Sequence, residues 1–120
     1  MELLKKDRNN LVLLSEGNSV NIHFDDPITE AIVYKNKILV KYDSYYSKDK
    51  CNIVCLNANG EVVWRVQSPL KIFPEMKEWE SAFTGFFIKD NDEIRGYTWS
   101  GNSFTIDKDT GEISNPHWSK

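Results

Sequence analysis

The sequence is poor in the residues that most often carry chemistry or covalent bracing. Its 120 residues include only two cysteines, Cys51 and Cys55, and two histidines, His23 and His117. On one strand the two cysteines would lie about 13 Å apart, four steps of roughly 3.3 Å, which is too far for a disulfide. They could give a metal site two ligands, with only the histidines to complete it. We therefore expect two reduced thiols on one face of a strand, and neither a metal nor a cofactor.

Long apolar runs, linkers and low-complexity segments are also missing. The first nine residues carry charges throughout, so they indicate neither a signal peptide nor a membrane-spanning helix. No Gly/Ser-rich stretch divides the chain, and its length is that of one domain. We expect a single β-rich domain over residues 1–120, in the cytoplasm and without membrane contact.

The charge balance is slightly acidic, with a formal net charge of −3. This argues against nucleic-acid binding, which usually requires a basic face. Lysines do gather near tyrosines, at Lys35, Lys37, Lys41, Lys48 and Lys50 beside Tyr34, Tyr42, Tyr45 and Tyr46. The first three of these lysines are explained more simply as the solvated face of two strands.

Short segments rich in β-branched and aromatic residues run through the chain and mostly alternate with polar residues. They are residues 10–14, 19–24, 30–36, 37–43, 51–57, 61–67, 85–90, 93–100, 103–107 and 111–114. The separators are rich in Gly, Asn and Asp, which favour hairpin turns. The pattern predicts a mainly β fold, an antiparallel meander of about 8–10 short strands in one or two packed sheets.

One segment, FPEMKEWESAF at 73–83, breaks the strand pattern. Pro74 suits a first helical turn, and Met76, Trp79 and Phe83 recur at helical spacing as one apolar stripe. We expect a short helix near 74–83 that packs this stripe on the sheet. Residues 43–50 and 114–120 are expected to be loops.

One hairpin pattern occurs three times, in residues 10–24, 52–66 and 102–114. The first two copies align without a gap at an offset of 42, and the third aligns at an offset of about 50 with one extra turn residue. A single hairpin is only marginally stable in water. The repeat therefore predicts that several copies share buried faces.

The copies IVCLNANGEVVWRV and FTIDKDTGEI resemble the blade repeat of PQQ-type β-propellers. The resemblance implies four-stranded antiparallel units, and Trp64 stands at the blade tryptophan, with Ile22 and Asn115 at the equivalent positions. A propeller needs at least about four blades of about 40–45 residues. This chain is too short to close one alone, and it shows no quinone site.

Catalytic signatures are missing, since no P-loop, G-x-G-x-x-G or G-x-S-x-G motif occurs. The DKDTGEI stretch lacks the spacing of an EF-hand, and Asp107 is expected to cap its own turn. Acidic loops and aromatic residues in loops are instead typical of protein interfaces. The candidate partner-binding residues are Asp25, Asp26, Tyr45, Tyr46, Asp90, Asp92, Glu93 and Trp118.

In size, acidity and lack of catalytic motifs, the chain resembles the small immunity proteins that neutralise bacterial toxins, including those of contact-dependent inhibition systems. The resemblance implies a monomer or small oligomer whose partner is a basic, nuclease-like toxin domain, with its active site covered. Two alternatives remain. One is a structural or oligomeric β-repeat module without inhibitory role, and the other is a small enzyme that uses His117 or His23.

Overall fold

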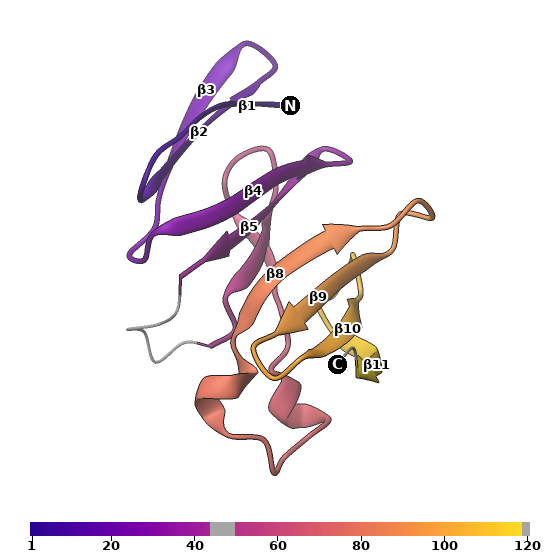
Figure 1. Cartoon of the computed structure of the whole chain (residues 1–120). Coiled ribbons are helices and arrows are strands. Elements are labelled where there is room, and N and C mark those ends of the chain that lie inside the picture. The colour runs from indigo at the N-terminus through magenta and orange to yellow at the C-terminus, as the bar shows by residue number, and fades with distance from the viewer. Residues whose placement is uncertain (44–49, 119–120) are drawn as a thin grey trace.

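The computed structural model describes residues 1–43 and 50–118, and it shows an antiparallel β protein (Figure 1). Within these residues the chain forms eleven strands. They are β1 (Glu2–Lys6), β2 (Asn10–Ser15), β3 (Asn18–His23), β4 (Ile28–Tyr34), β5 (Lys37–Tyr42), β6 (Ile53–Leu56), β7 (Val62–Arg65), β8 (Phe83–Ile88), β9 (Ile94–Thr98), β10 (Asn102–Ile106) and β11 (Ile113–Trp118). The predicted mainly β meander is confirmed.

The described strands make three sheets, where the sequence predicted one or two. Sheet I has the order β1-β2-β3, sheet II β4-β5-β6-β7 and sheet III β8-β9-β10-β11, each a meander of neighbouring strands. Figure 1 shows the three sheets following one another through the molecule. Sheet II lies between the other two, because its residues contribute to both hydrophobic clusters of the core.

The sequences of β5 and β6 explain why sheet II is the central layer. β6 is entirely apolar, β5 is apolar over residues 38–40, and both strands are buried along nearly their whole length, as expected for strands covered on two faces. Ile38 and Val40 pack with sheet I, whereas the intervening Leu39 packs with sheet III. The period-two alternation of a strand thus supplies both layers of the core.

The three sequence repeats occupy the same place in their sheets. They are the hairpins β2–β3, β6–β7 and β10–β11, the last two strands of each sheet. Their turns contain Gly17, Gly60 and Gly111, each with a φ close to +80°. Only glycine adopts such a φ without steric cost, so the repeat in the sequence is a repeat of hairpin geometry.

The helix predicted near 74–83 does not form. The 3₁₀ turn η2 (Glu78–Ser81) lies in its place, and a second 3₁₀ turn, η1 (Pro69–Lys71), precedes it. Lys77 has an extended backbone, with φ −70° and ψ 142°, and this interrupts the segment. Phe83 is not on a helix, because it pairs with Thr98 as the first residue of β8. A helix of two or three turns is marginal by itself, so strand pairing and packing decide the local structure.

Three further expectations need correction. Strand β1 was not predicted, and β11 extends to Trp118 through the segment expected to be a loop. Lys41, expected on a solvated face, is only 6% exposed. The predicted loop at 43–50 lies largely outside the described residues.

As predicted, Cys51 and Cys55 form no disulfide with each other, and both pack against the cluster between sheets II and III. They do not share a strand, because β6 begins at Ile53 and Cys51 precedes it. Burial raises the pKa of the Cys55 thiol above its usual value. In the part of the chain that the structure describes, no helix has the length and apolar character needed to span a membrane.

Candidate functional site: a tryptophan-lined groove

Three of the four tryptophans are exposed to an unusual degree for so large an apolar side chain. The exposed fractions are 55% for Trp79, 66% for Trp99 and 65% for Trp118, whereas Trp64 is buried. The three exposed side chains line one groove of about 620 Å³. We call it the tryptophan groove, and its described lining consists of Phe73, Glu75, Met76, Trp79, Glu80, Trp99, Ser100, Asn102 and Trp118.

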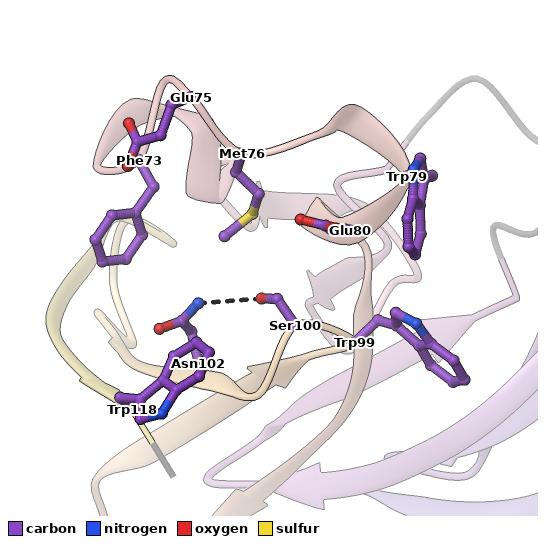
Figure 2. A pocket seen from close by; sticks show the side chains of 9 residues that line it. All are labelled: Phe73, Glu75, Met76, Trp79, Glu80, Trp99, Ser100, Asn102 and Trp118. Carbon is purple, nitrogen blue, oxygen red and sulfur yellow. Dashed lines mark hydrogen bonds between the residues drawn. The ribbon is translucent and has the colours of Figure 1, made fainter. Parts of the chain in front are cut away.

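Segments far apart in the sequence form the two walls of the tryptophan groove (Figure 2). One wall is the 73–80 segment around η2, from which Met76 and Glu80 extend toward the space. The opposite wall is the β9–β10 turn with Trp99, together with Trp118 at the end of β11. The groove therefore depends on the packing of the η1–η2 segment against the end of sheet III.

Local hydrogen bonds hold both walls in shape. In the β9–β10 turn, the Asn102 side-chain amide donates to Ser100 Oγ at 3.0 Å, and Ser100 Oγ also lies 2.8 Å from Thr98 Oγ1. On the other wall, the Ser81 hydroxyl donates to the carbonyl oxygen of Glu78 at 2.6 Å and closes η2. These bonds fix the backbone from which Trp99 and its neighbour Trp79 project.

The lining combines aromatic surface with negative charge. Glu75 and Glu80 are the ionisable residues of its described lining, and no lysine, arginine or histidine is among them. Met76 adds a flexible apolar side chain that adapts to different shapes. Such a surface suits a partner that presents apolar groups beside cationic side chains, since cations are attracted both to indole faces and to carboxylates.

Among the residues predicted to bind a partner, Trp118 lines the tryptophan groove. Tyr45 and Tyr46 lie outside the described residues. Asp25 and Asp26 follow β3 and line a separate depression, which they share with Arg65. The structure therefore does not place these two carboxylates beside Trp118.

The acidic β8–β9 turn is distant from the tryptophan groove for a topological reason. Successive turns of a meander lie at opposite ends of its strands, so Asp90, Asp92 and Glu93 lie at the other end of sheet III from Trp99. Asp92 is paired with Lys35 Nζ at 3.0 Å, and Glu93 lies 3.7 Å from Arg95 Nη1. Two of the three carboxylates thus already have a cationic neighbour.

Sequence reasoning missed most of the groove. It assigned Trp79 to the core, because Met76, Trp79 and Phe83 matched a helical stripe. Trp99 received no role, because it was placed within the predicted strand 93–100, whereas β9 ends at Thr98 and leaves Trp99 in the turn. The signal available was a large aromatic residue next to the predicted turn at residues 100–102.

The two histidines and Asp107, the remaining candidate residues, are not part of the described lining of the tryptophan groove. His23 Nδ1 lies 3.0 Å from Asn10 Oδ1, and His117 lines a shallow polar depression with Arg95. The carboxylate of Asp107 accepts hydrogen bonds from the backbone N–H groups of Asp109 and Thr110, at 2.8 and 3.1 Å, so its predicted capping role is confirmed. Within residues 1–43 and 50–118, no three His, Cys, Asp or Glu residues are grouped as metal ligands would be.

Fold and groove together define an all-β protein of three stacked antiparallel meanders with an exposed aromatic groove at one end. The chain belongs to the family described as Domain of unknown function (DUF7957), whose family model matches residues 3–118. A comparison with curated proteins found no match.

Proposed function

We propose that this protein is a protein-binding module, and specifically an immunity protein that neutralises a basic bacterial toxin domain in the cytoplasm. The observation that carries the proposal is the gathering of three exposed tryptophans, Trp79, Trp99 and Trp118, around one groove. Tryptophan is among the residues most often found at the energetic centre of protein interfaces. Exposing three of them in one place is costly unless a partner covers them.

The proposed mechanism is occlusion of the toxin's active-site cleft. A nuclease-like toxin carries cationic groups that bind phosphates, and Glu75 and Glu80 would face such groups across the interface. The tryptophans would supply the buried anchors, while the net charge of −3 accelerates encounter with a basic partner. Asp25, Asp26 and Asp90 contribute to this long-range field from outside the groove.

The test is a pull-down of the tagged full-length chain from its native cells at low salt. The groove variant carries Trp99→Ala and Trp118→Ala, and the matched control carries Phe87→Ala and Tyr97→Ala. Phe87 and Tyr97 are also exposed aromatic residues, and their ring centroids lie 6.3 Å apart on the outer face of sheet III. The wild type and the control should retain one basic protein that is released as salt rises, and the groove variant should lose it.

Growth tests with the captured protein then show whether this chain acts as an immunity protein. Expressed alone it should stop growth, and co-expression with the wild type, but not with the groove variant, should restore growth. A harmless partner would refute immunity while leaving a binding module. A triple variant with Asp90→Lys, Asp92→Lys and Glu93→Lys tests the acidic turn separately, and unchanged binding would remove that turn from the interface.

A second candidate is a structural module that self-associates. It is favoured by the outer face of sheet III, where Phe87 and Tyr97 lie exposed on a sheet whose other face is packed. Light scattering across a range of concentrations separates the two functions. Self-association that is lost with Phe87→Ala and Tyr97→Ala would support the module, and a monomer would support the inhibitor. An enzymatic role for His117 or His23 is tested by replacing each with alanine. A variant that still protects cells removes that histidine as a catalytic candidate.

A further inference from the structure

Lys41 lies at a position of β5 where the alternation of the strand predicts a buried core residue. It lies two residues after Leu39 on β5, so its side chain is on the face that packs toward sheet III. The residue is only 6% exposed, and burial lowers the pKa of its ammonium group. Burying a charge is costly unless it is paired, so the site requires an explanation beyond packing.

The ammonium group has fewer partners than it can use. Its Nζ donates to Thr29 Oγ1 at 2.5 Å, and this is its one hydrogen bond among the described residues. A lysine ammonium carries three N–H donors. Glu30 and Asp43 act on Lys41 only as nearby charges that favour its protonated form. The group therefore retains donor capacity at a nearly buried position.

This donor lies in the wall of a cleft of about 750 Å³, which is within the size range of small-molecule sites. The described lining consists of Thr29, Lys41, Asp43, Lys50, Asn52, Trp79, Ala82, Phe83, Thr84 and Trp99. Trp79 and Trp99 also line the tryptophan groove, so they form a wall common to both spaces. The cleft thus combines a buried cation with two large aromatic surfaces.

The other buried polar side chain of the cleft is fully used by the fold. The Asn52 amide donates to the carbonyl oxygens of Tyr42 and Phe83, at 2.9 and 2.8 Å, and its Oδ1 accepts from the Phe83 N–H at 2.9 Å. Asn52 therefore fixes the floor of the cleft and has little capacity for a ligand. Lys41 is the buried group with capacity left.

We propose that this cleft binds a small flat organic anion, an aromatic ring that bears a carboxylate or a phosphate. The acidic group accepts hydrogen bonds from Lys41 Nζ, and the ring packs against Trp79 and Trp99. Asp43 and Lys50, which also line the cleft, carry opposite charges, so Lys41 accounts for the net positive charge of the described lining. The cleft shares Trp79 and Trp99 with the tryptophan groove, but binding of the anion does not require a protein partner in that groove.

The test uses benzoate, its neutral analogue benzamide, and phenyl phosphate as probes of the full-length chain. Binding is followed by calorimetry and by backbone amide shifts in NMR spectra. Benzoate or phenyl phosphate should bind and shift the amides around Lys41, Asn52 and Trp99, and benzamide should bind at least about tenfold more weakly because it lacks the charge. The stronger of the two anions identifies the acidic group that the site prefers.

Substitutions in and outside the cleft test whether the anion binds there. Lys41→Met keeps most of the side chain but removes the cation, and it should weaken binding of the anion at least about tenfold. Trp99→Ala should also weaken binding, whereas Trp118→Ala, which lines only the groove, and Lys71→Met, at an exposed site, should not. The proposal is overturned if neither anion binds, if benzamide binds as tightly as the anions, or if the amide shifts of the wild type fall outside the cleft.

Discussion

The indole ring of Trp64 in β7 lies against the backbone of Gly111 in the β10–β11 turn. A methyl group built on Gly111 would come within 2.7 Å of the indole Cε3, so only glycine allows this approach. The indole Nε1–H donates to the carbonyl oxygen of Lys108 in the same turn at 2.8 Å. One side chain thus joins the last strand of sheet II to the last hairpin of sheet III.

The preceding pair of sheets repeats this relationship with an aliphatic residue. Ile22 stands at the position equivalent to Trp64, and it packs against Gly60 in the β6–β7 turn, where an added methyl group would lie 3.0 Å from Ile22 Cγ1. The repeated hairpin therefore carries the contact by which one sheet stacks on the next. Glycine is therefore required at this turn position for two reasons, the positive φ and the close contact with the neighbouring sheet.

Replacing Gly111 by alanine should destabilise the protein strongly. The new side chain would face a φ of +78°, which costs about 1–2 kcal/mol for an L-residue, and it would also collide with Trp64 and with the Arg65 carbonyl. We expect a loss of about 2–4 kcal/mol in the free energy of unfolding, measured by urea denaturation.

Gly17 provides the matched control for that substitution. Its φ is +80°, but no atom lies within 4 Å of the position that an added methyl group would take. Gly17→Ala should therefore show the conformational cost alone, about 1–2 kcal/mol. Equal losses for the two variants would show that the contact with Trp64 contributes nothing.

Asn52 should be essential for joining sheets II and III. Asn52→Ala would remove three hydrogen bonds to buried backbone groups of Tyr42 and Phe83. Each unsatisfied buried group costs about 1–3 kcal/mol, so we expect a loss of about 3 kcal/mol or more in the free energy of unfolding. Asn10 is its counterpart in the first repeat and is exposed, so Asn10→Ala should cost about 1 kcal/mol or less. Similar losses of stability for Asn52→Ala and Asn10→Ala would contradict the role of Asn52 in joining sheets II and III.

The hairpins could be predicted from the sequence because their information is local. The alternation of β2 and β10, the turn at Gly60 and the capping by Asp107 all depend on residues close together in the chain. Where strands were predicted, the structure places strands. The register of the repeat also predicted which hairpins would be equivalent.

The stacking of the sheets and the tryptophan groove depend on contacts between distant segments, and these were not predicted. The 74–83 stripe satisfied a helical pattern, but pairing of Phe83 with Thr98 drew its last residue into β8. Trp79 and Trp118 meet at one groove only because the η1–η2 segment packs on sheet III. Lys41 was assigned to a solvated face because it follows Lys35 and Lys37 along two neighbouring strands, and the apolar residues 38–40 between them were not taken as a sign that both faces of the strand are covered.

Asp107 should make stability depend on acid pH. Its carboxylate accepts backbone hydrogen bonds from Asp109 and Thr110, and these hold its pKa below the usual 3.8. The unfolded chain therefore takes up this proton first, so the contribution is present above pH 3.8 and is lost as pH falls through the lower folded pKa. Asn57, in the equivalent turn, shows that an amide fits, because its Oδ1 accepts from Asn59 N at 2.9 Å.

The Asp107→Asn variant keeps an acceptor but removes this titration. Urea denaturation from pH 6 downward should show the wild type more stable above pH 3.8, with the difference shrinking at lower pH. A difference that stays constant across this range would show that the carboxylate has the same pKa in both states.

Lys41 should make stability depend on alkaline pH in the opposite sense. Burial lowers its pKa in the folded chain from 10.5, although Glu30 and Asp43 oppose the shift. At a pH between the lowered pKa and 10.5, Lys41 is protonated in more of the unfolded chains than of the folded chains. The contribution of Lys41 to the free energy of unfolding therefore increases as pH rises through that window. Below the window both states are protonated, and the folded state bears the full cost of the buried charge.

Lys41→Met abolishes this titration and keeps an unbranched side chain of similar length. The stability of the wild type relative to the variant should therefore improve as pH rises toward 10.5, as measured by urea denaturation at fixed ionic strength. Cys55, whose pKa is raised by burial, gives an opposing trend above pH 9.0, but it is present in both proteins and cancels in the comparison. A relative stability that does not change with pH would mean that the charges of Glu30 and Asp43 fully offset the cost of burial, so that the Lys41 ammonium has the same pKa in the folded and the unfolded chain.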